Sequence, residues 1–146
     1  MIVVANRQAL PVDLARIRRT LRTALRALGV WDHELSLTLV DDRTIRRLNA
    51  RYRGVRRRTD VLAFPLAGPA PVFGEAIISV EAARRQAHAL GHSLREELDL
   101  LCCHACLHLA GYDDRQPLEA RLMHGREMDL LGQLYARPAP TLHVGA

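Results

Sequence analysis

One segment, residues 93–114, constrains the fold of this chain more than any other. Ser93 and Glu96 have the spacing of a capping box, which predicts that a helix begins there. Gly111 supplies a C-cap at which the chain can double back. Apolar residues between these two points form one stripe centred on Leu98, so this helix is expected to bury one face in a core. The stripe contains Leu94, Leu98, Cys102, Ala105 and Leu109.

The same helix carries two histidines that are spaced for metal binding. His104 and His108 are four residues apart and therefore point from nearly the same face of the helix, at the border between the core and the surface. Asp114 follows the Gly111 turn and can return to the same point. Two histidines and one carboxylate leave a fourth position for water, which is typical of a catalytic zinc. The alternative is that the histidines form a polar stripe or a hydrogen-bonded core pair.

Other polar residues of this helix have more than one interpretation. Glu97 lies on the same border and either supports a metal ligand or belongs to a solvated helix face. Cys102, Cys103 and Cys106 do not converge with the histidines, so we expect them to be small, buried or half-buried side chains. Their odd number argues against a disulfide scaffold and favours a reducing compartment.

The length and the composition predict one domain. A chain of 146 residues, 49% of them hydrophobic, can form one well-packed core but not two comfortable ones. We place the domain at residues 1–137 and expect a frayed tail at 138–146. No apolar run approaches a membrane span of about 20 residues, and the first residues lack the apolar stretch of a signal peptide, so a cytoplasmic location is expected.

The order of apolar patterns predicts an α+β (α/β) fold. Alternating and fully apolar runs indicate strands, and a spacing of three to four residues indicates helices. The expected architecture is a four-stranded mixed sheet packed against about five helices, with the metal site at the C-terminal end of a central helix. The predicted strands are 2–5, 33–40, 61–64 and 75–80, the helices are 11–28, 42–52, 81–90, 93–110 and one that begins near Pro117, and residues 67–72 form a loop.

The positive charge of the chain suggests a polyanionic partner. The net charge is +5, and all 21 basic residues are arginines. Guanidinium groups bind phosphate oxygens in a bidentate way, so nucleic acid is the simplest partner. The alternative is a solvated loop that only maintains solubility. The densest group of arginines is Arg51, Arg53, Arg56, Arg57 and Arg58.

The residue after the first histidine argues against a protease. A zincin needs a glutamate there as general base, and this chain has Ala105. An ion that activates water beside an arginine-rich wall instead fits hydrolysis of a phosphodiester, because arginine neutralises the charge that develops on the phosphoryl group.

These blocks resemble a known family. Residues 104–114 resemble the HGxLHLxGYDH motif of the YbeY endoribonucleases, the rRNA maturation factors. Residues 48–54 and 59–65 resemble the family's LNxxYRGxxxxTDVLSFP segment, and residues 74–77 resemble its GDI strand. The blocks keep the family's order and approximate spacing from about residue 33 to residue 131.

The resemblance implies a set of site residues. The metal ligands fall on His104, His108 and Asp114, with Asp114 in place of the usual histidine, and the expected cofactor is one Zn²⁺ ion. The anionic ligand predicts a higher pKa for the activated water and a shift toward harder ions such as Mn²⁺. Asp113 is expected to support a ligand or to shape the turn, and His124 is an outside candidate for the third ligand.

The arginines also receive roles. Arg53 matches the family's functionally important arginine and would clamp a phosphate, unless it only pairs with a surface carboxylate. We assign substrate binding to the other four arginines of the group, which are Arg51, Arg56, Arg57 and Arg58.

The implied function is that of a single-strand-specific, metal-dependent endoribonuclease of the bacterial cytoplasm. It would act in maturation of the 16S rRNA 3′ end and in ribosome quality control, with single-stranded RNA, the ribosome or small-subunit assembly factors as partners and no membrane. One alternative is an assembly factor in which a structural metal pins the Gly111 turn and RNA binding is the activity. A third alternative is that the protein hydrolyses a smaller phosphoester or an amide.

Overall fold

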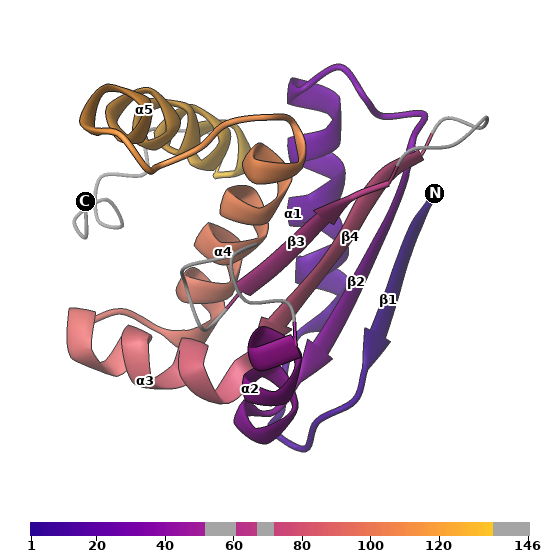
Figure 1. Ribbon diagram of the computed structural model, residues 1–146, viewed down its shortest axis with the longest axis vertical. Helices are drawn as coiled ribbons and strands as arrows, with labels where there is room; N and C mark the ends of the chain where they lie inside the picture. Colours follow the sequence, from indigo (N-terminus) through magenta and orange to yellow (C-terminus); the bar gives the residue numbers. More distant parts are fainter. Residues whose placement is uncertain (52–60, 67–71, 136–146) are drawn as a thin grey trace.

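A computed structural model describes residues 1–51, 61–66 and 72–135. In the described residues, five helices and four strands follow one another in the order β-α-β-α-β-β-α-α-α (Figure 1). The elements are β1 (Ile2–Asn6), α1 (Leu14–Ala27), β2 (Glu34–Val40), α2 (Asp42–Arg51), β3 (Val61–Pro65), β4 (Val72–Ser79), α3 (Val80–Leu90), α4 (Leu94–Leu109) and α5 (Pro117–Leu134).

The strands form the mixed sheet that the sequence predicts. Their order is β1-β2-β4-β3, in which β1, β2 and β4 are parallel and β3 is antiparallel to β4. The parallel pairs are joined through helices, as parallel strands require. The strand β1 lies at one edge, as expected from its short apolar run.

The two faces of the sheet are covered unequally. Leu35, Leu37 and Leu39 of β2 belong to the large core that the sheet shares with α1, α4 and α5. Leu62 and Ile77 belong to a second, smaller core with residues of α2. The alternation of these side chains follows from the two-residue period of a strand. The fold class that we predict from the sequence is therefore confirmed. None of the helices in the described ranges is long and apolar enough to cross a membrane.

The helix α4 lies at the centre of the large core. It begins at the expected capping box, because the Ser93 hydroxyl accepts a hydrogen bond from the Glu96 amide while the Glu96 carboxylate accepts one from the Ser93 amide. The predicted apolar stripe is buried except for Leu94, which is half-buried, and Cys103 and Cys106 are buried as well. The helix is thus surrounded by protein over most of its circumference, with α1, α3, α5 and the sheet as neighbours (Figure 1).

Gly74 allows the end of α4 to approach the sheet. A Cβ atom at this position would lie 2.5 Å from Leu109 Cδ2 and 2.8 Å from the Phe64 carbonyl oxygen. Neither distance is tolerable, so only glycine fits. The predicted boundary between the loop at 67–72 and the strand at 75–80 was wrong. The strand β4 begins at Val72 and continues through Gly74. Residues 67–71 lie outside the described part of the chain.

Other helix boundaries also differ from the prediction. The helix α1 begins three residues later than Pro11, because the Asp13 side chain caps it at the Arg16 amide. At the start of α2, the Asp41 carboxylate accepts a hydrogen bond from the Thr44 amide, and Asp42, the first residue of the predicted helix, lies in the first turn. In both places a neighbouring residue is also polar or turn-forming, so the local pattern is ambiguous.

A buried ion pair fastens α1 to α4. The Arg16 Nε and Nη2 atoms donate to the Asp99 carboxylate at 3.1 and 2.6 Å, and Asp99 is 1% exposed. Thr20 and Tyr135 donate their hydroxyl groups to the same carboxylate. Burial is the largest cause that raises the pKa of Tyr135 above its usual value, so the phenol remains a donor. One carboxylate therefore connects α1, α4 and the residue that follows α5.

Replacing Asp99 with asparagine should lower the stability of the fold. Asp99→Asn leaves the Arg16 guanidinium without its counter-charge, which costs about 3 kcal/mol in the free energy of unfolding and lowers Tm by about 10 °C. Asp129→Asn is the matched control. The Asp129 carboxylate is exposed to solvent, and its contact with Arg126 is long, at 3.7 Å, so its loss should change stability little. Equal thermal unfolding curves for the two variants would contradict the anchoring role.

Candidate metal centre

The chain turns back immediately after α4. Gly111 has φ +103°, a conformation that favours glycine, and its amide donates to the His108 carbonyl at 3.0 Å. The Tyr112 amide donates to the Leu107 carbonyl at 3.0 Å. These bonds satisfy the last carbonyls of the helix, as in a Schellman-type ending, and return the chain toward the side of α4 that carries the histidines.

Three side chains meet at this end of α4. One ligand atom from each of His104, His108 and Asp114 lies within 4.8 Å of the other two. The two Nε2 atoms are 3.0 Å apart, and His104 Nε2 is 3.9 Å from Asp114 Oδ2. In a tetrahedral zinc site, ligand atoms lie about 3.3 Å apart. The group that the sequence predicts is therefore present, and it could hold a metal ion with a small movement of the carboxylate.

The hydrogen bonds of the two imidazole rings favour a bound cation. The Nδ1 atom of His104 contacts the Glu127 carboxylate, and the Nδ1 atom of His108 lies 3.1 Å from the Tyr112 carbonyl oxygen. Both partners are acceptors, so each Nδ1 carries the proton. The two Nε2 atoms face each other at 3.0 Å, and when both rings are neutral their lone pairs point at one another. Two such lone pairs are brought together favourably by a proton or by a metal ion between the nitrogens, so the donor set fits a metal ion.

The acidic residues of the turn have different positions. The Asp113 carboxylate accepts the Asp114 amide at 2.7 Å and pairs with Arg115 at 3.0 Å. Asp113 therefore shapes the turn that presents Asp114 and is not one of the three grouped residues. Asp113, Asp114 and Glu127 give this end of α4 an excess of negative charge over Arg115, which attracts a cation.

Glu127 is a site residue that our sequence analysis missed. It is 7% exposed on α5 and reaches His104 from 23 positions further along the chain. Its signal in the sequence is a carboxylate at core spacing, four residues after the buried Met123 and three before the buried Leu130. His124, the outside candidate for a third ligand, does not belong to the group; its side chain is 45% exposed and 3.6 Å from the same carboxylate.

Glu97 does not lie on a solvated face. It is fully buried, and its Oε1 atom lies 2.6 Å from His92 Nε2. The interpretation of Glu97 as a surface residue was wrong because α4 is covered on more sides than the stripe indicates. It is also not among the three residues of the metal group.

The cysteines are buried, as predicted. Cys102, Cys103 and Cys106 are free thiols and at most 1% exposed. Burial raises the pKa of Cys106 to about 12 and raises those of the other two thiols well above their usual value. They therefore remain protonated near neutral pH, whereas a metal ligand has to be a thiolate.

The predicted arginine group falls almost entirely outside the described residues. Arg53, Arg56, Arg57 and Arg58 all lie there. Arg51 is described, and it is an exposed residue of the last turn of α2. The roles assigned to these arginines stay predictions.

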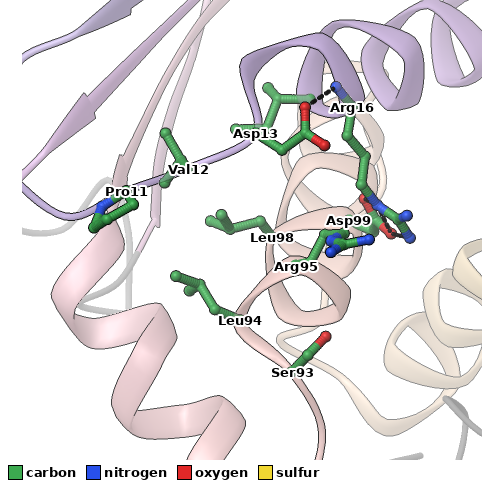
Figure 2. A pocket seen from close by; sticks show the side chains of 10 residues that line it. Pro11, Val12, Asp13, Arg16, Ser93, Leu94, Arg95, Leu98 and Asp99 are labelled. Carbon is green, nitrogen blue, oxygen red and sulfur yellow. Dashed lines mark hydrogen bonds and ion pairs between the residues drawn. The ribbon is translucent and has the colours of Figure 1, made fainter.

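A large hollow lies at the opposite half of α4. It measures about 430 Å³ and lies between the start of α1 and the start of α4 (Figure 2). Figure 2 shows Leu94 and Leu98 facing this space and the Arg16–Asp99 pair at its side. None of the three grouped residues lines it. The hollow is therefore separate from the candidate metal group.

The fold and the site together define a class of protein: a single α+β domain whose central helix ends in a His-His-Asp group that could hold a metal. A sequence model of the family described as Endoribonuclease YbeY matches residues 3–135. The chain belongs to this family of nucleases.

Similar proteins support the assignment. An Endoribonuclease YbeY of Thermobifida fusca is 39% identical over 89% of this chain and 91% of its own length. One of Pelotomaculum thermopropionicum is 40% identical over 91% of this chain and 96% of its own length. One of an Anaeromyxobacter species is 42% identical over 79% of this chain, which spans only 62% of that relative. The solution structure of a Thermotoga maritima protein has a TM-score of 0.66 at 25% identity and covers 93% of this chain and 90% of its own.

Removing the charge of Glu127 should weaken metal binding. Glu127→Gln keeps the size of the side chain and an oxygen that can accept from His104 Nδ1, but it removes the negative charge that makes the ring a stronger ligand, so we expect zinc affinity to fall about tenfold or more. The measurement is a competition titration against a chromophoric chelator. Glu119→Gln is the matched control, since Glu119 is an exposed carboxylate of the same helix. Unchanged affinity in Glu127→Gln would exclude a role for the Glu127 charge in metal binding.

Proposed function

We propose that the protein is a zinc-dependent, single-strand-specific endoribonuclease. The observation that carries the proposal is the convergence of His104, His108 and Asp114 at the end of α4, in a chain of the YbeY family. When bound, the ion would lower the pKa of a water molecule and polarise the phosphoryl oxygen of the scissile phosphodiester.

The residues of this chain would each have a defined task. His104 and His108 offer their Nε2 atoms, because Glu127 and the Tyr112 carbonyl hold the protons on Nδ1. Asp114 offers a carboxylate oxygen, and its negative charge favours harder ions than three histidines would. Three protein ligands leave one coordination position for water, which is the pattern of a catalytic site.

The arginines at the end of α2 and after it would hold the substrate. Arg53 would clamp the phosphate and stabilise the charge that develops during hydrolysis. Arg51, Arg56, Arg57 and Arg58 would contact neighbouring phosphates and bind without base preference. The positive net charge of +5 supports a polyanionic substrate.

The biological substrate that we propose is the 16S rRNA in the bacterial cytoplasm. Cleavage would contribute to maturation of its 3′ end and to ribosome quality control, in contact with the ribosome or small-subunit assembly factors. This part of the proposal follows from the resemblance of the motifs in residues 48–77 and 104–114 to the family.

Cleavage of a single-stranded fragment from the 3′ end of 16S rRNA tests the proposed activity. We expect the purified protein to cut it, chelation to stop cleavage and zinc to restore it. His108→Ala should be inactive, whereas His88→Ala, which removes an exposed histidine of α3, should cut normally. If both variants cut equally, the activity is a contaminant. If wild-type protein binds the RNA and never cuts it, the protein is an assembly factor with a structural metal.

Replacing Arg53 tests the phosphate clamp. Arg53→Ala should lower kcat by roughly 100-fold, corresponding to about 3 kcal/mol of transition-state stabilisation. Bound zinc and Tm should stay at the wild-type values, and Arg84→Ala, at an exposed position of α3, should retain full turnover. A lower Tm in Arg53→Ala than in the wild-type protein would instead assign Arg53 to a structural ion pair.

A further inference from the structure

The outer side of α1 carries only positive charge. The helix contains five arginines and no aspartate or glutamate. One of them, Arg16, is neutralised by Asp99. Arg22 and Arg26 are exposed, and neither forms an ion pair with a carboxylate of the described residues. This side of α1 therefore presents charge that the fold itself does not use.

Three of these arginines line a hollow beside the first strand. Arg18, Arg22 and Arg26 follow at intervals of four, so they share one side of α1 at steps of about 6 Å along its axis. The hollow measures about 320 Å³. Its lining consists of Met1, Ile2, Arg18, Arg22, Leu25, Arg26 and Trp31, with no acidic residue among them.

The arginines of the hollow differ in what they contact. Arg18 is half-buried, and its Nη1 atom donates to the Ile2 carbonyl at 3.3 Å, which ties α1 to β1. Arg22 and Arg26 extend further into solvent and form the rim of the hollow. Two guanidinium groups are thus available to an external anion at a fixed spacing.

A tryptophan completes the hollow. Trp31 lies in the loop between α1 and β2, lines the hollow together with Met1, and is 69% exposed. The carboxylate of the following Asp32 contacts His33 at 3.0 Å and does not line the hollow. An exposed aromatic ring beside guanidinium groups is the combination that binds single-stranded nucleic acid, because bases stack on the ring while arginines hold the phosphates.

We propose that this surface is a second RNA-binding site, in which Arg22 and Arg26 contact phosphates and a base stacks on Trp31. Its residues come from α1, the start of β1 and the loop after α1, whereas the metal group comes from α4 and the turn that follows it. The inference rests on the proposed function for the class of ligand. The site would hold a flanking part of a long RNA while another part is cleaved.

Trp31 is the single tryptophan of the chain, so its fluorescence reports directly on this surface. The probe is an oligouridylate of about 16 nucleotides, titrated into metal-depleted protein so that no cleavage occurs. We expect saturable quenching that weakens with salt. Arg22→Gln/Arg26→Gln should reduce affinity about tenfold or more and lower the slope of log affinity against log salt by about 1.4, since each phosphate contact in a single strand contributes about 0.7.

Matched variants separate local contacts from net charge. Arg84→Gln/Arg95→Gln removes two exposed arginines from α3 and α4 and should leave both affinity and slope near the wild-type values. Trp31→Ala, followed by anisotropy of labelled RNA, should lose about tenfold in affinity with an unchanged salt slope, because stacking releases no counterions.

Several results would overturn the proposal. They are an absence of quenching, equal losses in the two double variants, and quenching by polyglutamate or by anionic vesicles in place of RNA. Cleavage of a short RNA at saturating concentration is measured separately, and Arg22→Gln/Arg26→Gln should retain it. If wild-type protein never cleaves RNA but Trp31 is still quenched by it, the proposed function fails and the second site stands.

Discussion

The burial of α4 on nearly all sides is the constraint on which the rest of this structure depends. Eleven of its sixteen residues are buried, so the polar groups among them need partners inside the protein. Each acidic or basic side chain in the buried part of α4 contacts a partner outside the helix. Glu97 contacts His92 just before the helix, Asp99 contacts Arg16 of α1, and His104 contacts Glu127 of α5. The same helix therefore supplies apolar contacts to the core and fixes the rotamers of its own functional side chains. A rigid support of this kind is what a metal site requires of its surroundings.

How much the sequence predicts depends on how local the determining contacts are. The capping box of Ser93 and Glu96, the turn at Gly111 and the grouping of the two histidines with Asp114 depend on residues within about a dozen positions, and all were predicted. The predicted start of β4 at residue 75 was wrong, because the strand begins at Val72 and includes Gly74. Its place in a strand follows from Leu109, 35 positions away, which occupies the space of a side chain. Glu127 was missed for the same reason, since its partner His104 lies 23 positions away.

The two proposed RNA contacts have different origins in the sequence. The arginines after α2 belong to a motif that resembles the family, so pattern alone draws attention to them. Arg22 and Arg26 belong to a helix whose sequence has the usual amphipathic pattern, so the pattern does not distinguish them from other surface arginines. Only the fold brings them beside Trp31 and the first strand. A dispersed surface of this type is recognised by finding charges that have no internal partner, whereas a compact motif is recognised by spacing.

The position of the three grouped residues also bears on how the molecule folds. His104, His108 and Asp114 lie within eleven consecutive residues, so bringing them together closes a very short loop and costs little chain entropy. The sheet, by contrast, must join β2 to β4 across more than thirty residues. The candidate ligands therefore meet through α4 and its terminal turn alone, whereas Glu127 reaches His104 only because α5 packs on α4. The grouping of the candidate ligands is thus a local property of this chain, and the orientation of the His104 ring depends on the whole fold.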